Sequence, residues 1–109
     1  MLGSDTLRGY NDTIILHVLM DGDNYGYAIS ARIDADSKGV YPIKETTLYS
    51  TFARMEKKGF VTSYYGDESF GRRRIYYSIT GEGKKYYKDK CIEWQQTKEV
   101  IDKFTRKDF

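Results

Sequence analysis

The sequence predicts an α+β fold that is mostly helical and forms one small domain of 109 residues. Three observations lead to this prediction. Apolar residues recur at intervals of three and four in several segments between residues 7 and 59, which indicates helices. Two runs rich in β-branched and aromatic residues follow between residues 60 and 79, which indicates a β-hairpin. Residues 84–104 contain no helix breaker, which indicates one long final helix.

The first predicted helix spans residues 7–20. Its apolar side chains cover more than a single stripe, so we expect the helix to be buried on more than one side. These side chains are Leu7, Ile14, Ile15, Leu16, Val18 and Leu19. Gly22 suits the position just past the end of a helix. His17 is the single histidine, so we interpret it as a residue at the edge of the core or at an interface, not as a metal ligand.

A second helix is expected to begin near Tyr25 and to end near residues 37–39. Asp23 and Asn24 are both good N-cap residues for it. Gly26 lies in this helix, where glycine costs about 1 kcal/mol relative to alanine, so we expect another backbone to approach closely there. Pro42 disfavours helical backbone at the residue before it, so residues 40–43 should form a short extended connector.

The third predicted helix, residues 44–59, has an unusual outer face. Its inward positions carry the apolar residues Leu48, Phe52 and Met55. Its outward positions are mostly small or carry a hydroxyl: Thr46, Ser50, Ala53 and Lys57. An ordinary solvated face, usually rich in Glu, Lys and Gln, is the alternative interpretation. Small outward side chains suit close contact with another surface, and a DNA major groove admits a helix of this width.

The predicted hairpin places basic residues beside this helix. Residues 60–65 and 75–79 form its strands, and residues 66–71 form a turn-rich loop bounded by glycines. Residues 72–74 are three arginines in a row, which put positive charge on both faces of the return strand. The second and third predicted helices, joined by a tight connector, make a helix-turn-helix arrangement. A hairpin directly after it is the wing of a winged helix-turn-helix domain. We assign residues 1–80 to such a domain, with three helices and a two-stranded β-wing.

Residues 81–109 are assigned to a long C-terminal dimerisation helix, with Thr80 as its cap. A narrow seam of side chains runs along it at alternating spacings of three and four. The seam contains Tyr87, Lys90 or Cys91, Trp94, Thr97, Ile101 and Phe104. The domain has too little surface left to cover this seam, so we expect a second copy of the chain to pack there.

Charge and composition narrow the classes of function. Residues 1–43 carry a net charge of −3 and residues 44–109 a net charge of +5, so positive charge is concentrated around the third helix and the wing. Cys91 is the single cysteine, and no signal peptide or membrane-spanning apolar run is seen, so we expect a cytoplasmic protein. The sequence lacks a recognisable catalytic set, a phosphate-binding glycine loop and a Cys/His metal cluster. We therefore predict neither enzymatic activity nor a cofactor.

Five stretches of the sequence resemble motifs of the PadR transcriptional regulators, in the same order. They are residues 25–29, 47–49, 54–61, 72–77 and 77–83. In that family the patterns read YGYEI, TLY, RLExxGLI, RRxYY and YxLTxxG. The resemblance runs from about Leu7 to Phe104, and the length and the single C-terminal helix resemble the short class of the family.

The resemblance implies a homodimeric winged-helix repressor that binds operator DNA through the helix around residues 47–49. It also implies that the first and last helices form the dimer interface. In drug-sensing members of the short class, planar aromatic ligands bind between the subunits against a tryptophan, and Trp94 matches that position. Lys98 lies where a multidrug-binding member has an acidic residue, which disfavours cationic ligands here. The alternative for Trp94 is stacking on its symmetry partner.

The candidate site residues fall into three groups. DNA contacts are expected from Lys44, Thr46, Thr47, Tyr49, Ser50, Arg54, Lys57, Arg72, Arg73 and Arg74. Ligand contacts are expected from Ile15, Cys91, Trp94 and Lys98. Dimer contacts are expected from Leu7, Tyr87, Trp94, Ile101 and Phe104. Two alternative functions use the same scaffold: a winged-helix module that binds protein, and a small-molecule-binding protein without specific DNA binding.

Overall fold

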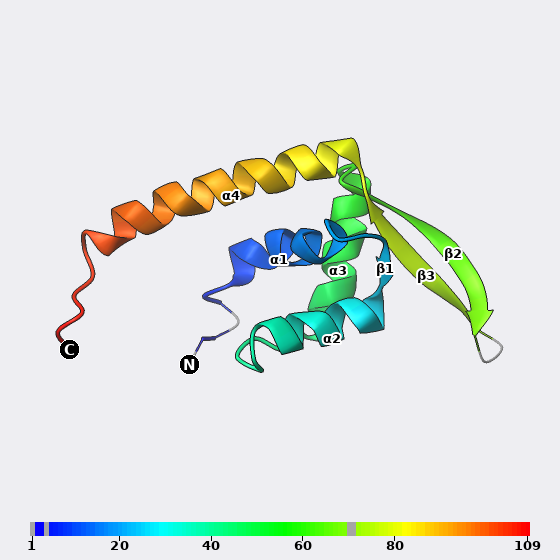
Figure 1. Ribbon diagram of the computed structural model, residues 1–109, viewed down its shortest axis with the longest axis horizontal. Helices are drawn as coiled ribbons and strands as arrows, with labels where there is room; N and C mark the ends of the chain where they lie inside the picture. The colour runs from blue at the N-terminus through cyan, green and yellow to red at the C-terminus, as the bar shows by residue number, and fades with distance from the viewer. Residues whose placement is uncertain (1, 4, 70–71) are drawn as a thin grey trace.

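A computed structural model describes residues 2–3, 5–69 and 72–109, and the side chains of residues 67–69 and 72 lie outside the description. Its elements are a 3-10 helix Arg8–Tyr10, α1 (Asn11–Leu19), β1 (Asn24–Tyr25), α2 (Gly26–Asp36), α3 (Glu45–Lys57), β2 (Val61–Ser69), β3 (Arg72–Ile79) and α4 (Gly81–Asp102). Figure 1 shows α1, α2 and α3 gathered below α4. The β2–β3 hairpin projects from the end of the molecule opposite the C-terminus. The structure thus confirms the predicted α+β winged-helix fold, mostly helical, with a long final helix.

The core lies between the first three helices and the base of the sheet. Its fully buried side chains come from α1, α2, α3 and β2 and include Ile15, Leu16, Leu19, Ile29, Leu48, Phe52, Met55 and Val61. The Phe52 ring stacks on Tyr77 of β3, with ring centroids 3.8 Å apart. This stack holds α3 against the hairpin. The inward face of α3 carries Leu48, Phe52 and Met55, as predicted.

The helix boundaries follow local backbone chemistry. The first helix was expected from Leu7, but α1 begins at Asn11 after a 3-10 turn, in a stretch where Gly9 weakens helix formation. Gly22 and Gly59 follow α1 and α3 with φ of 137° and 81°, conformations that glycine adopts without a steric penalty. The predicted ends of both helices are therefore confirmed.

A third strand, β1, joins the predicted hairpin. The sheet order is β1-β3-β2, with Asn24 opposite Tyr77 and Tyr25 opposite Tyr76. The prediction that Asp23 or Asn24 caps the second helix is therefore wrong: Tyr25 occupies the N-cap position, and the Asn24 side chain accepts from the Tyr25 N–H at 2.9 Å. A two-stranded wing becomes a three-stranded sheet because the chain pairs with β3 just before α2 begins.

The hairpin strands are longer than predicted. Residues 66–69 were expected in a loop, but β2 runs to Ser69, with a register shift between Tyr65 and Glu68. A Cβ atom at Gly66 would lie 2.3 Å from the Tyr76 ring, so that ring lies directly against the glycine. The irregular pairing at this point is that of a β-bulge, which bends the strand without ending it.

The last helix is fixed at its base and extends far beyond the core. The Thr80 hydroxyl accepts from the Gly83 N–H at 3.0 Å and donates to the Gly59 carbonyl at 2.6 Å, which confirms Thr80 as the cap. From there α4 runs over α1, and its final turns reach past the other helices (Figure 1). In the part of the chain that the structure describes, helices that could cross a membrane are absent.

Candidate DNA-binding surface and C-terminal groove

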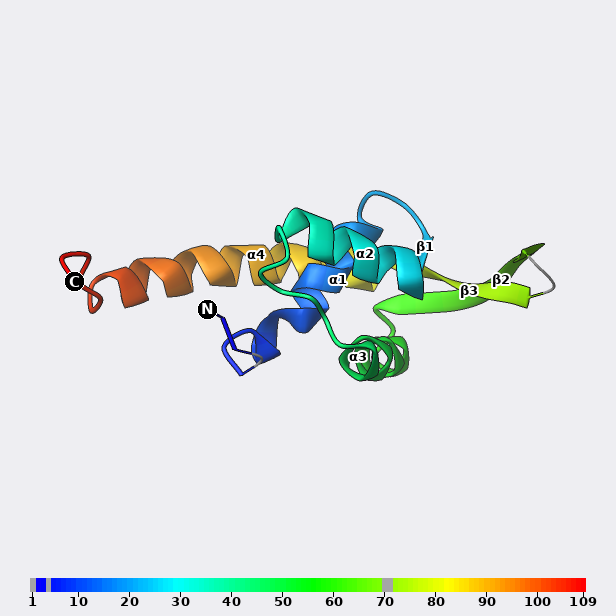
Figure 2. The ribbon, with the colours of Figure 1, turned by 90° about the horizontal axis from the view of Figure 1, so that it is seen from below.

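The outer face of α3 is open along its length. Thr46, Ser50, Ala53 and Lys57 are exposed, as is Lys44 just before the helix. The Ser50 hydroxyl donates to the Thr47 carbonyl at 3.1 Å, as does the buried Thr51 at 2.7 Å. Ser50 still presents its oxygen as an acceptor, so this face offers small polar groups on a rigid helix. Figure 2 views α3 along its axis and shows that it lies at the edge of the helical layer.

Tyr49 links this face to the start of α2. Its ring meets Phe52 edge-on, with centroids 5.9 Å apart, and just under half of the residue is exposed. A Cβ atom at Gly26 would lie 2.6 Å from the Tyr49 hydroxyl oxygen. The expectation that another backbone approaches Gly26 is therefore wrong, because the close neighbour is this side chain.

Gly26→Ala is expected to lower the free energy of unfolding by about 1 kcal/mol, because the Tyr49 ring must move to admit the methyl group. In a Tyr49→Ala background the same change should be neutral or stabilising, since alanine favours the helix. Urea unfolding of the four proteins measures the difference. An equal cost of Gly26→Ala in both backgrounds would mean that Tyr49 is not the neighbour that excludes a side chain.

The wing brings arginines toward the same area. The Arg74 guanidinium lies over the Tyr25 ring, 4.4 Å from its centroid, and Arg73 is exposed on the other face of β3. The predicted contact from Arg72 falls on a side chain outside the described residues. The Tyr64 hydroxyl donates to Asp23 at 2.6 Å, and this bond raises the pKa of Tyr64, so its hydroxyl stays neutral.

A hollow of about 450 Å³ joins α3 to the wing. Its lining comes from the start of α2, from α3 and from β3: Tyr25, Gly26, Tyr27, Tyr49, Arg73, Arg74, Ile75 and Tyr77. Tyr49, Arg73 and Arg74 line this hollow, while the other expected DNA contacts on α3 lie outside it: Thr46, Thr47, Ser50, Arg54 and Lys57. The hollow therefore brings Tyr49 of α3 next to Arg73 and Arg74 of β3.

Arg54 has a partner inside the protein. Its guanidinium forms an ion pair with the Asp12 carboxylate of α1, while close to half of the Arg54 side chain remains exposed. Asp12 was not among the expected site residues, and it lies 42 positions away in sequence. Only the fold reveals this pairing.

A second, mostly apolar groove of about 760 Å³ lies between the N-terminal segment and α4. Its lining is Leu2, Thr6, Leu7, Tyr10, Thr13, Ile14, Cys91, Trp94, Gln95, Thr97, Lys98, Ile101, Asp102 and Thr105. Trp94 is 43% exposed and meets Tyr10 edge-on at 5.2 Å between centroids. Five of the expected ligand or dimer residues therefore share this groove. Ile15 departs from the expectation, because it is fully buried in the core and Ile14 lines the groove in its place.

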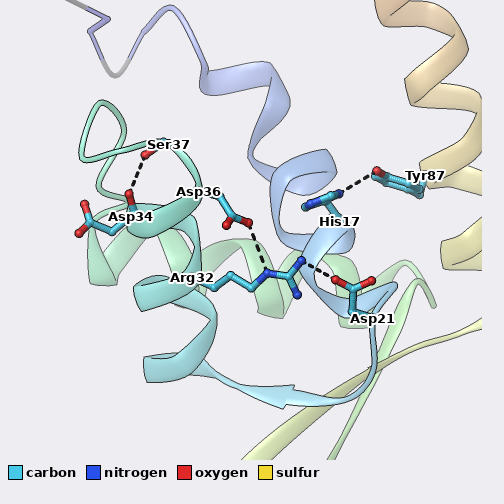
Figure 3. Close-up of polar contacts among 7 residues, drawn as sticks. All are labelled: His17, Asp21, Arg32, Asp34, Asp36, Ser37 and Tyr87. Carbon is cyan, nitrogen blue, oxygen red and sulfur yellow. Dashed lines mark hydrogen bonds and ion pairs between the residues drawn. The ribbon is translucent and has the colours of Figure 1, made fainter.

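The remaining two expected interface residues lie outside the groove. Phe104 is 80% exposed beyond the end of α4. Tyr87 faces α1, where its hydroxyl oxygen lies 3.2 Å from His17 Nδ1 (Figure 3). Burial raises the pKa of the Tyr87 hydroxyl, and the neighbouring Cys91 adds to this rise. His17 therefore lies at the contact between α1 and α4, as an edge or interface residue was expected to do.

Figure 3 also shows how α1 and α2 are held together below this contact. Arg32 of α2 pairs with Asp21 after α1 and, at 3.3 Å, with Asp36 of its own helix. Hydrogen bonding to Asp21 is the main reason that the pKa of Arg32 is raised. Groups of three or more potential metal ligands are absent from the described residues.

The sequence pattern that defines the transcriptional regulator PadR-like family matches residues 15–89. The chain belongs to the PadR family of transcriptional regulators. A transcriptional regulator from Clostridium thermocellum is similar over 97% of this chain and all of its own, with 57% identity and a TM-score of 0.90. A PadR family transcription regulator from Clostridium difficile is 38% identical, covers 88% of this chain and 98% of its own, and has a TM-score of 0.76.

Two further similarities extend the comparison. "Uncharacterized protein X" of Lysinibacillus sphaericus is 46% identical over 104 residues, which cover 95% of both chains. Bacillus subtilis PadR in complex with operator DNA shares the fold, with a TM-score of 0.68 over 74% of this chain and 46% of its own, at 22% identity. The PadR-family match ends at residue 89, so Trp94 and the other groove-lining residues of α4 lie beyond it.

Proposed function

We propose that this PadR-family chain is a DNA-binding repressor that inserts α3 into the major groove of an operator. The observation that carries this proposal is the open face of α3 with its small residues. Beside that face, Tyr49 shares the hollow of about 450 Å³ with Arg73 and Arg74 of the wing. Side chains that reach base edges specify sequence, whereas arginines on a wing position the protein on phosphates. The operator complex of Bacillus subtilis PadR supports the same use of the fold. Such a repressor would act in the cytoplasm.

We further infer that the repressor is a homodimer formed through α4. The second half of α4 exposes Ile92, Trp94, Val100 and Ile101, and Phe104 is exposed just beyond the end of the helix. Burying such side chains against a second copy removes apolar surface from water, at roughly 25 cal/mol per Å². A two-fold dimer would present two recognition helices to successive major grooves, about 34 Å apart.

The groove beside Trp94 is the proposed site for a planar aromatic effector. Its lining is mostly apolar and includes two charged residues, Lys98 and Asp102. A ligand there can release DNA only if it binds more tightly to the arrangement of the subunits that does not fit the operator.

Planar aromatic compounds that enter this groove are expected to quench the fluorescence of Trp94, the only tryptophan. Trp94→Ala should abolish the effector's influence on DNA affinity and leave DNA affinity itself within about threefold, because Trp94 lines the groove on α4 and not the outer face of α3. Anisotropy of labelled operator DNA, titrated with and without compound, measures both effects. Loss of DNA binding in the Trp94→Ala protein would assign Trp94 to the dimer contact alone.

Binding to the DNA upstream of its own gene tests the main proposal. Affinity should fall steeply with salt, with a log–log slope of about −0.9 for each phosphate contacted, and should exceed that for unrelated DNA by at least about 10³-fold. Weak binding that ignores sequence would instead favour a winged-helix module for protein contacts. Tight binding of aromatic compounds without any DNA preference would favour a small-molecule-binding protein.

A further inference from the structure

A single buried carboxylate connects the recognition helix to the dimerisation helix. Asp12 lies in the first turn of α1 and is only 8% exposed. Its Oδ1 accepts from the Arg54 guanidinium of α3, and its Oδ2 accepts from the Tyr86 hydroxyl of α4 at 3.4 Å. A buried carboxylate is stable only where such donors replace water. Each of its oxygens therefore depends on a different helix.

Arg54 stands at the border of the DNA-facing surface. It follows Ser50 by one helical turn, and 46% of its side chain is exposed. Arginine has five N–H donors in a fixed plane, so the guanidinium can bond to Asp12 and still offer donors outward. The position of the Asp12 carboxylate therefore determines where those free donors point.

Tyr86 lies near the start of α4, so the position of its hydroxyl depends on the position of that helix. Its ring stacks on Phe60, which follows α3, with centroids 4.3 Å apart. Burial raises the pKa of the Tyr86 hydroxyl and the Asp12 carboxylate raises it further, so the hydroxyl remains a donor. The far half of α4 carries the groove with Trp94. A shift of the helix against α1 therefore reaches the hydroxyl of Tyr86.

We propose that Asp12 is a positioning residue that couples the placement of α4 to the orientation of Arg54 on the recognition helix. While Tyr86 donates to Oδ2, Arg54 bonds to Oδ1 and keeps its other donors free for DNA. When α4 moves and Tyr86 leaves, both carboxylate oxygens become available to the guanidinium, which favours a bidentate pair directed inward. Arg54 then withdraws from DNA, and operator affinity falls. This inference rests on the proposed function, because Arg54, one of the DNA contacts expected from the sequence, can touch DNA only if α3 enters the major groove.

Tyr86→Phe isolates the hydroxyl, because phenylalanine keeps the stack on Phe60. It is expected to weaken operator binding about fivefold in the wild-type background and to have no effect in an Asp12→Asn or Arg54→Ala background. Tyr41→Phe is the matched control: it also removes a tyrosine hydroxyl that bonds to the first turn of α1, at Asn11 Oδ1, 2.5 Å away. This control should leave operator affinity within twofold. An equal effect of Tyr86→Phe in all three backgrounds would overturn the coupling.

A second measurement does not require DNA. The Nε–H resonance of Arg54, assigned by its loss in Arg54→Lys, should shift when Tyr86→Phe is made in the wild-type protein and should not shift when the same change is made in Asp12→Asn. An unchanged resonance in Tyr86→Phe would overturn the proposal even if the Asp12 variant failed to fold. Failure of the wild-type protein to prefer its operator would refute the proposed function alone, while the arginine resonance would still decide whether Asp12 couples the two helices.

Discussion

Gly83→Ala is expected to lower the free energy of unfolding by about 3 kcal/mol, at the upper end of the cost of overpacking. Gly83 lies in the first turn of α4, and a Cβ atom there would come within 2.1 Å of the Phe60 carbonyl oxygen and 2.8 Å of Ile79 Cγ1. The carbonyl cannot easily move aside, because it accepts the Thr80 N–H at 3.0 Å. The methyl group must therefore push α4 away from the junction of α3 and β2.

Gly81→Ala is the matched control for this change. It lies two residues earlier in the same turn, and a Cβ atom there would meet no other atom within 4 Å. Because alanine favours helix by about 1 kcal/mol over glycine, this variant should be neutral or slightly stabilised. Urea unfolding followed by circular dichroism, at one fixed protein concentration, measures both proteins. Equal stability of the two variants would show that α4 does not sit tightly on this junction.

The elements that sequence patterns predicted are those whose signals are local. The apolar spacing on α3, the glycine after each of α1 and α3, and the Thr80 cap each depend on residues within a turn or two. Local chemistry of this kind acts before tertiary contacts form, so it is visible in the residues themselves. The same reasoning separated the buried face of α3 from its open face.

The features that the sequence did not reveal depend on contacts between distant segments. Two residues, Asn24 and Tyr25, are too short to show the alternation of a strand, and their pairing with β3 is set by the fold. Gly26 could be recognised as unfavourable in a helix, but its neighbour Tyr49 could not be identified. The strand continues past Gly66 through an irregular pairing with β3, with the Tyr76 ring against the glycine, and no local pattern shows either contact.

The residues of the candidate site also fall into those that the sequence predicts and those that depend on contacts between distant segments. The helix face and the arginines of the wing could be predicted, because residue type and helical or strand period place them. The groove beside Trp94 was expected to include Ile15, but a helix that is apolar on several sides does not show which apolar residue turns to the core. The Asp12–Arg54 pair could not be predicted, since an acidic residue in the first turn of a helix is ordinarily explained by the helix dipole.

Ser50→Glu is expected to reduce operator affinity about 100-fold, or close to 3 kcal/mol. Ser50 is exposed at the middle of the outer face of α3, so a carboxylate there would enter the groove between two rows of phosphates. Glutamate is a better helix former than serine, and the position is open, so the stability of the free protein should hardly change. The loss should therefore appear in DNA binding, measured by anisotropy, and not in urea unfolding.

Gln96→Glu is the matched control, because it adds the same single negative charge at an exposed position on α4. If long-range repulsion by net charge were the cause, both variants would weaken binding equally, and added salt would remove most of the difference from wild type. If α3 lies in the major groove, Gln96→Glu should stay within about twofold of wild type, while the Ser50→Glu defect should persist at high salt as a loss of preference for the operator. Equal, small effects of both variants would place the DNA contact on some other surface. A negative charge inside the DNA groove must weaken binding more than the same charge on α4.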